Sequence, residues 1–165
     1  MHGSNYRQVK SMAYTSKKFA PGAPQLKIAK FTGGAGKPDY ELLVSLVTQV
    51  RAQIRHNALE AARVSLNRVM AEIGETEFFS LLKIYPHIIL RENKMIATAG
   101  ADRLQEGMRR AFGKPVGLAA KVKVGDTIME LRIKKANLDI ARKAMKRASS
   151  KLPVKTSLVI TDIVR

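Results

Sequence analysis

Residues 94–117 have the sequence KMIATAGADRLQEGMRRAFGKPVG, which is rich in glycine and in basic residues. It lies between two segments that are typical of β-strands and has no strand pattern of its own. A connection of this length inside a compact domain is uncommon and is usually functional or disordered. Glycine lets a backbone approach a partner closely, and the planar donor fork of arginine suits phosphate. The stretch therefore predicts a basic loop that contacts a polyanion, through Lys94, Arg103, Arg109, Arg110 and Lys114.

The composition narrows the class of partner. The chain has 165 residues, and 30 Lys and Arg against 13 Asp and Glu give it a formal net charge of +17. A hydrophobic fraction of 45% argues against global disorder and permits one domain with a core. So large a positive excess resists compaction unless a polyanion neutralises it, which favours a nucleic-acid partner. An anionic membrane surface stays open on charge alone, although no apolar run approaches the length of a spanning helix.

Two further regions hold basic residues without acids. Residues 1–38 form an irregular basic arm with interleaved aromatic residues and a possible short strand at 26–31; Arg7, Lys10, Lys17 and Lys18 lie in this arm. The second block lies on and just after a predicted helix and consists of Arg142, Lys143, Lys146, Arg147 and Lys151. One such block is typical of a solvated face or a terminus. Two blocks and a basic loop favour a protein that binds RNA or DNA phosphates at several points.

The remaining sequence predicts an α+β body. Residues 41–50 fit both a strand and a helix. A helix follows, with Asn57 and Glu60 as a capping box and Gly74 at its C-terminal end. Its apolar stripe consists of Leu59, Ala62, Leu66, Val69, Met70 and Ile73. Residues 78–90 are typical of a strand in which Pro86 forces a bulge or an edge position.

After the loop, residues 118–124 and 127–134 alternate as strands do, and Gly125-Asp126 between them fits a hairpin turn. Asn137 is expected to cap a second helix, and residues 157–164 are expected to form a final strand, apolar on both faces at 158–160. These elements predict a mostly antiparallel sheet with two helices packed on one face. The expected organisation is a basic N-terminal arm at 1–38 and a single α+β domain at 39–165, with an internal loop at 92–117.

Enzyme motifs are absent. Residues 33–37, GGAGK, lack the spacing of a phosphate-binding loop, and a flexible basic turn is the better interpretation. The three histidines have no metal-binding spacing, and there is no cysteine, which also excludes disulfides and fits a reducing cytoplasm. Asp102 and Glu106, four residues apart within the loop, are better explained as ion-pair partners of nearby arginines than as an acid–base pair. No catalytic residue, metal site or cofactor is expected.

The run GADRLQEGMRRAFGKPVG, preceded by Lys94-Met95, closely resembles the most characteristic segment of a universal large-ribosomal-subunit protein family, called L-sixteen in bacteria and L-ten-e in archaea and eukaryotes. Similar segments include YR…AYT.KKFAPGAPQLKI in the arm, ALEAARVSLNRVM as a first helix and VKVGDTIMELRIK as a hairpin. The length and the end at Arg165 resemble archaeal members. The start MHGSNYR and residues 31–34 depart from the family pattern, which leaves local arm contacts open.

The resemblance implies an α+β sandwich, with a strand at the ambiguous residues 41–50. It implies a structural constituent of the cytoplasmic ribosome that binds large-subunit rRNA near the aminoacyl-tRNA site. The loop would point toward the peptidyl transferase centre and help to position A-site and P-site tRNA, beside neighbouring ribosomal proteins. Neither a membrane nor a homo-oligomer is expected.

Within that frame, the expected rRNA- and tRNA-binding residues are Arg7, Lys10, Lys17, Lys18, Lys94, Arg103, Arg109, Arg110, Phe112 and Lys114. Gly100, Gly107 and Gly113 would let the loop backbone approach RNA closely. Phe112 would stack on a base or pack on the loop's own aliphatic residues. The alternative function is a free RNA chaperone or an architectural nucleic-acid-binding protein, which would explain the charge but not the long internal loop.

Overall fold

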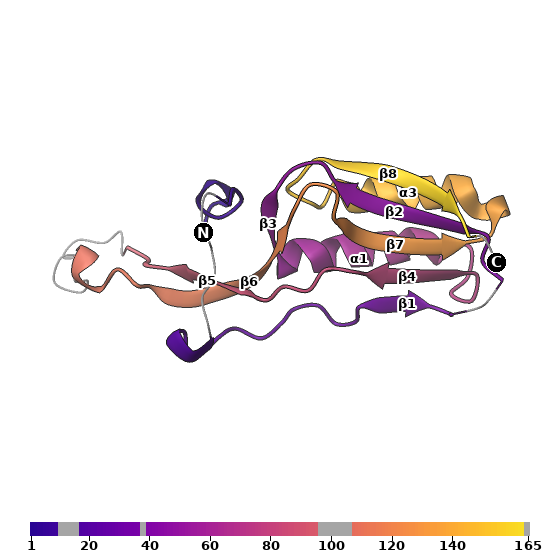
Figure 1. The fold of residues 1–165 in the computed structure, drawn as a ribbon. Helices are drawn as coiled ribbons and strands as arrows, with labels where there is room; N and C mark the ends of the chain where they lie inside the picture. The colour runs from indigo at the N-terminus through magenta and orange to yellow at the C-terminus, as the bar shows by residue number, and fades with distance from the viewer. Residues whose placement is uncertain (10–16, 37–38, 96–106, 164–165) are drawn as a thin grey trace.

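The computed structural model describes residues 1–9, 17–36, 39–95 and 107–163 (Figure 1). Its strands are β1 (Thr32–Gly34), β2 (Leu42–Thr48), β3 (Ala52–Arg55), β4 (Phe78–Leu82), β5 (Ile88–Glu92), β6 (Lys114–Val122), β7 (Thr127–Ile133) and β8 (Thr156–Asp162). Its α-helices are α1 (His56–Met70) and α3 (Leu138–Ser149), and its short 3-10 helices are η1 (Gly3–Asn5), η2 (Lys17–Phe19), η3 (Gly107–Arg110) and η4 (Lys135–Asn137).

The strands form two antiparallel sheets. The larger has the order β1-β4-β7-β2-β8 and the smaller the order β3-β6-β5. Both α-helices cover the same face of the larger sheet (Figure 1). The predicted α+β class, with a mostly antiparallel sheet and two helices on one face, is confirmed.

Three segments of chain run through both sheets. β2 leads into β3, β4 into β5, and β6 into β7, so each segment gives one strand to each sheet. Hydrogen bonds join the end of β2 to the turn between β6 and β7. The Gly125 N–H donates to the Thr48 carbonyl at 2.9 Å, and the Thr48 N–H donates to the Asp126 carbonyl at 3.0 Å. The smaller sheet narrows into a two-stranded ribbon of β5 and β6 that projects from the body (Figure 1). The ribbon is therefore continuous with strands of the core sheet.

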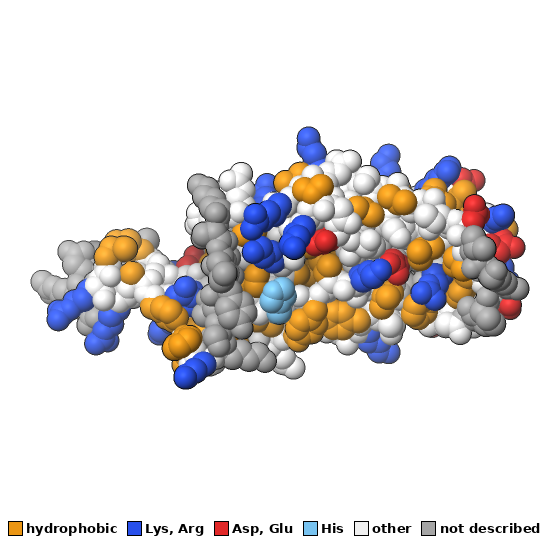
Figure 2. All heavy atoms as spheres, viewed as in Figure 1, with side chains coloured by type: hydrophobic (Ala, Val, Ile, Leu, Met, Phe, Trp, Pro, Cys, Tyr) orange, Lys and Arg blue, Asp and Glu red, His pale blue; other side chains and the backbone are white. Residues whose placement is uncertain are grey.

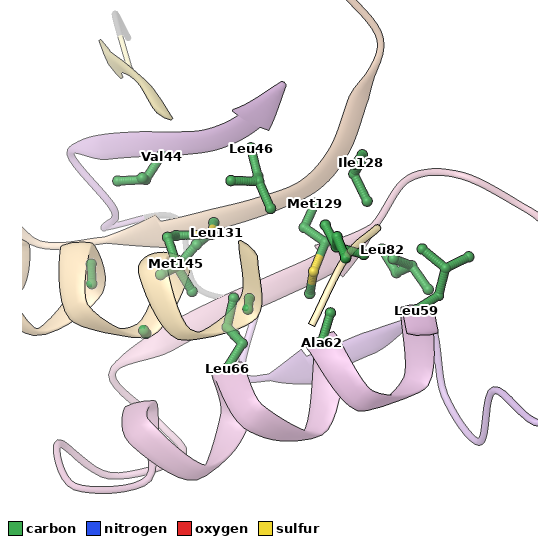
Figure 3. Packing of buried hydrophobic residues seen from close by; sticks show 14 of the residues in the cluster. Val44, Leu46, Leu59, Ala62, Leu66, Leu82, Ile128, Met129, Leu131 and Met145 are labelled. Carbon is green, nitrogen blue, oxygen red and sulfur yellow. The ribbon is translucent and has the colours of Figure 1, made fainter. Parts of the chain in front are cut away.

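The core lies between the larger sheet and the two helices. In Figure 3, Leu66 of α1 and Met145 of α3 point toward the sheet, where Leu131 and Val44 point back at them. All four side chains are fully buried. The predicted stripe on the first helix is confirmed for Leu59, Ala62, Leu66, Val69 and Met70. The second helix buries Ala141, Ala144, Met145 and Ala148. Alternate apolar residues of β7 complete the core from the sheet side.

Several expected elements differ from the structure. Residues 41–50 contain strand β2, as the family resemblance implies. Residues 26–31 form no strand; the short strand β1 begins at Thr32 and contains Gly33 and Gly34, where the sequence predicts a flexible turn. Gly34 has φ +78°, and a Cβ there would lie 2.1 Å from the Phe78 carbonyl oxygen. The glycines thus allow β1 to lie close against β4.

Residues 78–90 form two strands in different sheets instead of one. β4 ends at Leu82 and β5 begins at Ile88, with Pro86 in the break. The expected hairpin of residues 118–134 is also wrong. The turn at Gly125 is present, with φ +89°, but it takes the chain from β6 in one sheet to β7 in the other. The strands pair elsewhere, since Val122 faces Ala52 and Thr127 faces Val47.

The expected capping box is wrong as well. α1 begins at His56, its N-cap is Arg55, and no side chain caps it. Glu60 instead accepts two hydrogen bonds from the Arg63 guanidinium, at 2.9 and 2.6 Å, so its carboxylate is turned toward the next helical turn. Asn137 does occupy the N-cap of α3, without a side-chain hydrogen bond. Within the described ranges, no helix is long and apolar enough to cross a membrane.

Candidate nucleic-acid interface

The ribbon of β5 and β6 carries the basic loop. Leu90 pairs with Gly117, Arg91 with Pro115 and Glu92 with Lys114, and the register shifts between Leu90 and Arg91. Residues 114–117, expected within the loop, are therefore the start of a strand. A paired ribbon is stiffer than a free loop, because its backbone groups are held by inter-strand hydrogen bonds.

Gly113 closes the ribbon at its outer end. It has φ +76°, and a Cβ there would lie 2.7 Å from the Glu92 carbonyl carbon and 2.8 Å from the Asn93 nitrogen. Gly113 therefore lets two segments of the protein's own backbone lie close together. Gly107 has φ +54°, and a Cβ at this position would meet no atom of the described residues within 4 Å. Gly100 lies outside the described residues.

Phe112 is covered by a residue that the sequence does not single out. The Arg91 guanidinium lies 3.9 Å from the centre of the Phe112 ring, and its Nη1 donates to the Phe112 carbonyl at 2.6 Å. The ring remains 54% exposed. Arg91 and Phe112 thus form a cation–π contact, while one part of the ring stays open to solvent. Arg91 lies on the strand opposite, and its nearness could be found only from the pairing of β5 with β6.

The basic side chains gather at the outer end of the ribbon. Arg109 and Arg110 lie on η3 and are exposed, as are Lys94 and Lys114. The Asn93 side-chain amide donates to the Gly107 carbonyl at 3.2 Å, which ties η3 to the chain leaving β5. Arg103 and Lys10 lie outside the described residues. The structure therefore brings four of the predicted loop cations together, beside Phe112.

The beginning of the arm packs against the smaller sheet. Gln53 on β3 donates its N–H to the Arg7 carbonyl at 2.9 Å and its side-chain Nε2 to the Tyr6 carbonyl at 2.9 Å. The Arg55 guanidinium lies 5.7 Å from the centre of the Tyr6 ring. These contacts place exposed Arg7 at the root of the ribbon.

Lys17 and Lys18 lie on η2, apart from the loop cations in the sequence. The Lys18 ammonium lies 5.8 Å from the centre of the Phe19 ring, which is 64% exposed. An exposed aromatic ring beside a cation suits stacking and phosphate contact together.

Several acidic side chains lie on the body, away from the ribbon. On the face in Figure 2 they gather at the end of the body farthest from the ribbon. That end includes Asp39, Glu41 and Asp162, which lie around one hollow together with Lys134 and Lys135. Among the described residues, no three acidic, histidine or cysteine side chains are grouped to hold a metal ion.

His56 joins the arm to the body and is a polar residue of the core. It is only 2% exposed, and its Nδ1 accepts a hydrogen bond from the Lys27 N–H at 3.3 Å. Burial lowers the pKa of His56 below its ordinary value, and the charges of Arg55 and Lys27 lower that pKa further. The neutral imidazole is thus the form that fits this site.

The lowered pKa predicts acid sensitivity. Below about pH 6.5 the unfolded chain takes up a proton at His56 before the folded chain does, so the free energy of unfolding falls as the pH falls, by up to about 1.4 kcal/mol per pH unit. Above about pH 6.5 His56 is neutral in both the folded and the unfolded chain, so it adds no pH dependence to the free energy of unfolding. Urea denaturation from pH 7.5 to 5 should show a shallower decline for His56→Gln than for the unchanged protein. Equal slopes would contradict this assignment.

Fold and surface together define a class: an α+β protein that presents a basic ribbon beyond its core. A sequence profile of the family described as ribosomal protein L16p/L10e matches residues 8–159. The chain belongs to this family. It is accordingly a structural constituent of the large ribosomal subunit in the cytoplasm, associated with large-subunit rRNA and ribosomal proteins, and not an enzyme.

Archaeal relatives match nearly the whole chain. It is 53% identical over 164 residues to "Large ribosomal subunit protein uL16" of Metallosphaera sedula, a match that covers 98% of this chain and 94% of the relative. Proteins of the same name from Hyperthermus butylicus and Staphylothermus marinus are 51% and 48% identical, over 91% and 96% of this chain and 84% and 91% of the relatives. The expected archaeal type of this family is confirmed, and the free-chaperone alternative gains no support.

Proposed function

We propose that the protein binds large-subunit rRNA near the aminoacyl-tRNA site and extends its internal loop toward the peptidyl transferase centre. There the loop helps to position A-site and P-site tRNA. The observation that carries this proposal is the group of exposed cations at the outer end of a paired ribbon, Lys94, Arg109, Arg110 and Lys114. A basic group held away from the body can reach phosphates that the body cannot approach.

The ribbon supplies position as well as charge. β6 continues into β7 at the centre of the core sheet, and Gly113 packs on the backbone of residues 92–93. The outer end is thus held by backbone pairing, which reduces the entropy lost when it meets RNA. The loop would act by orienting and neutralising phosphates, since its described part offers no paired acid and base.

The arm serves as a second contact region in this proposal. Residues 1–38 follow rRNA through Arg7, Lys10, Lys17 and Lys18, and residues 39–165 form the body that carries the internal loop 92–117. Phe112 and Phe19 are exposed rings beside cations, which suits them to stack on unpaired bases. The protein acts as a single copy in each subunit.

The test is the double substitution Arg109→Ala with Arg110→Ala. Both residues are exposed, so the fold is expected to persist. Each exposed phosphate contact contributes about 0.5–1 kcal/mol, and losing both should slow tRNA accommodation by about five- to thirtyfold, or delay late maturation of the subunit to a similar degree. Rapid kinetics on ribosomes reconstituted with the variant, and sedimentation profiles of subunits, measure the two effects.

The matched control is Arg51→Ala with Lys155→Ala, which removes the same charge from exposed positions on the body. It should leave accommodation within about twofold of the unchanged ribosome. Wild-type rates for the loop variant, or the same slowing for both variants, would show that the loop arginines have no positioning role.

A further inference from the structure

β8 is an edge strand whose outer side is unpaired in the described structure. It is last in the order of the larger sheet. The Gln49 N–H donates to the Lys155 carbonyl at 3.0 Å, and the Ile163 N–H donates to the Glu41 carbonyl at 2.8 Å. The backbone N–H and C=O groups of the odd-numbered residues of β8 therefore point toward β2. By the alternation of antiparallel pairing, the backbone groups of Thr156, Leu158, Ile160 and Asp162 face outward.

This edge lacks the usual protection against pairing with another chain. Proteins commonly place lysine, proline or a bulge on an exposed edge. Residues 156–162, TSLVITD, contain neither lysine nor proline, and their pairing with β2 has no register shift. Leu158, Val159 and Ile160 are 39%, 42% and 37% exposed. An apolar edge of this kind is suited to receive a strand from a partner.

A groove runs between this edge and α3. Its volume is about 420 Å³, and Leu46, Met145, Leu158 and Ile160 supply its apolar lining. Arg142, Lys143 and Lys146 of α3 line it as well, and all three are exposed. The only acid on α3 is Asp139, in its first turn. The groove therefore offers apolar contact and positive charge side by side.

We propose that β8 and this groove bind an acidic protein segment, which adds a sixth strand to the larger sheet. Its backbone pairs with the outward groups of β8, its apolar side chains cover Leu158 and Ile160, and its carboxylates reach Arg142, Lys143 and Lys146. RNA phosphates would match the cations, but they would use neither the apolar lining nor the peptide groups of the edge. This surface is separate from the loop and is independent of its proposed role.

The test titrates the full chain with a capped probe peptide, Glu-Thr-Leu-Thr-Val-Thr-Glu, and reads amide chemical shifts by NMR. Shifts are expected at residues 156–162 and along α3. Two N-methylated forms of the peptide, modified at alternate residues in the two possible phases, distinguish strand addition from simple contact. Only one set of alternate amides of the bound peptide faces β8. The peptide methylated on that set should bind at least tenfold more weakly than the unmodified peptide, and the other methylated peptide should bind within about threefold of it.

Two charge-reversed proteins complete the test. Arg142→Glu with Lys146→Glu alters the groove, while Arg147→Glu with Lys151→Glu makes the same change in charge at exposed residues that do not line it. The first should weaken peptide binding at least tenfold and the second by no more than about twofold. The proposal is overturned by no peptide binding, by equal behaviour of the two N-methylated forms, by equal losses in the two variants, or by an oligouridylate that displaces the peptide from β8.

Discussion

Replacing Gly113 with alanine is expected to open the outer end of the ribbon. A non-glycine residue at φ +76° costs about 1–2 kcal/mol, and the added Cβ would also overlap the backbone of residues 92 and 93. Backbone atoms cannot rotate away as a flexible side chain can. Hydrogen exchange at residues 91–93, 114 and 116 should quicken by at least about tenfold, the ratio for 1.4 kcal/mol, while the core sheet remains protected.

Gly107→Ala is the matched control. It introduces the same side chain at another positive φ, +54°, where a Cβ meets no atom within 4 Å in the part of the chain that the structure describes. Its exchange rates at the ribbon should change by less than about fivefold. Ribosomes carrying Gly113→Ala should also accommodate tRNA more slowly than those carrying Gly107→Ala. Equal exchange in the two variants would mean that the backbone contact at Gly113 does not hold the ribbon closed.

The largest loss of stability is expected for Leu131→Ala. Leu131 is fully buried on the central strand β7, where it pairs with Val44 on one side and Ser80 on the other (Figure 3). Removing a buried leucine side chain costs its transfer free energy and leaves a cavity, together about 3–5 kcal/mol. Against a typical total of about 5–15 kcal/mol, this should lower the urea midpoint strongly and leave a significant unfolded fraction at elevated temperature.

Leu158→Ala supplies the comparison, since it removes the same atoms from a side chain that is 39% exposed. Its cost should be below about 1.5 kcal/mol, because part of that surface already contacts water. Urea denaturation of both variants, followed by circular dichroism, measures the difference. Similar midpoints would argue against a tightly packed core between β7 and the helices.

The helices are predictable because their signal is local. The stripe from Leu59 to Met70 repeats at helical spacing, and burial follows directly from that spacing. Strand partners are not predictable in the same way. The Gly125 turn suggests a hairpin of β6 with β7, the strand that follows it. Instead, β6 pairs with β3 and β5, which both precede it in the chain. A turn residue shows that the chain bends, but it does not show which strand lies on the other side.

In the candidate interface too, local features could be predicted from the sequence and contacts between strands could not. The loop cations stand out because glycine, arginine and lysine are dense in residues 94–117. The contact of Arg91 with Phe112 could not be found from spacing, because it depends on how two strands are paired and where η3 turns. Glu60 is a case where a local motif is misleading. The sequence has the spacing of a capping box, but the Glu60 carboxylate accepts the stronger, charge-assisted hydrogen bonds from Arg63.

The order of strands in the larger sheet has a consequence for biosynthesis. β7 occupies the middle, while its neighbours β2 and β4 leave the translating ribosome well before it, because both precede it in the chain. Until residue 133 has emerged, β2 and β4 cannot pair with β7. Until α3 has emerged, only α1 is available to cover the inner face of the sheet. The nascent chain therefore carries exposed apolar surface until late in its own translation, so its yield should depend on elongation speed and on the chaperones that meet it at the exit tunnel.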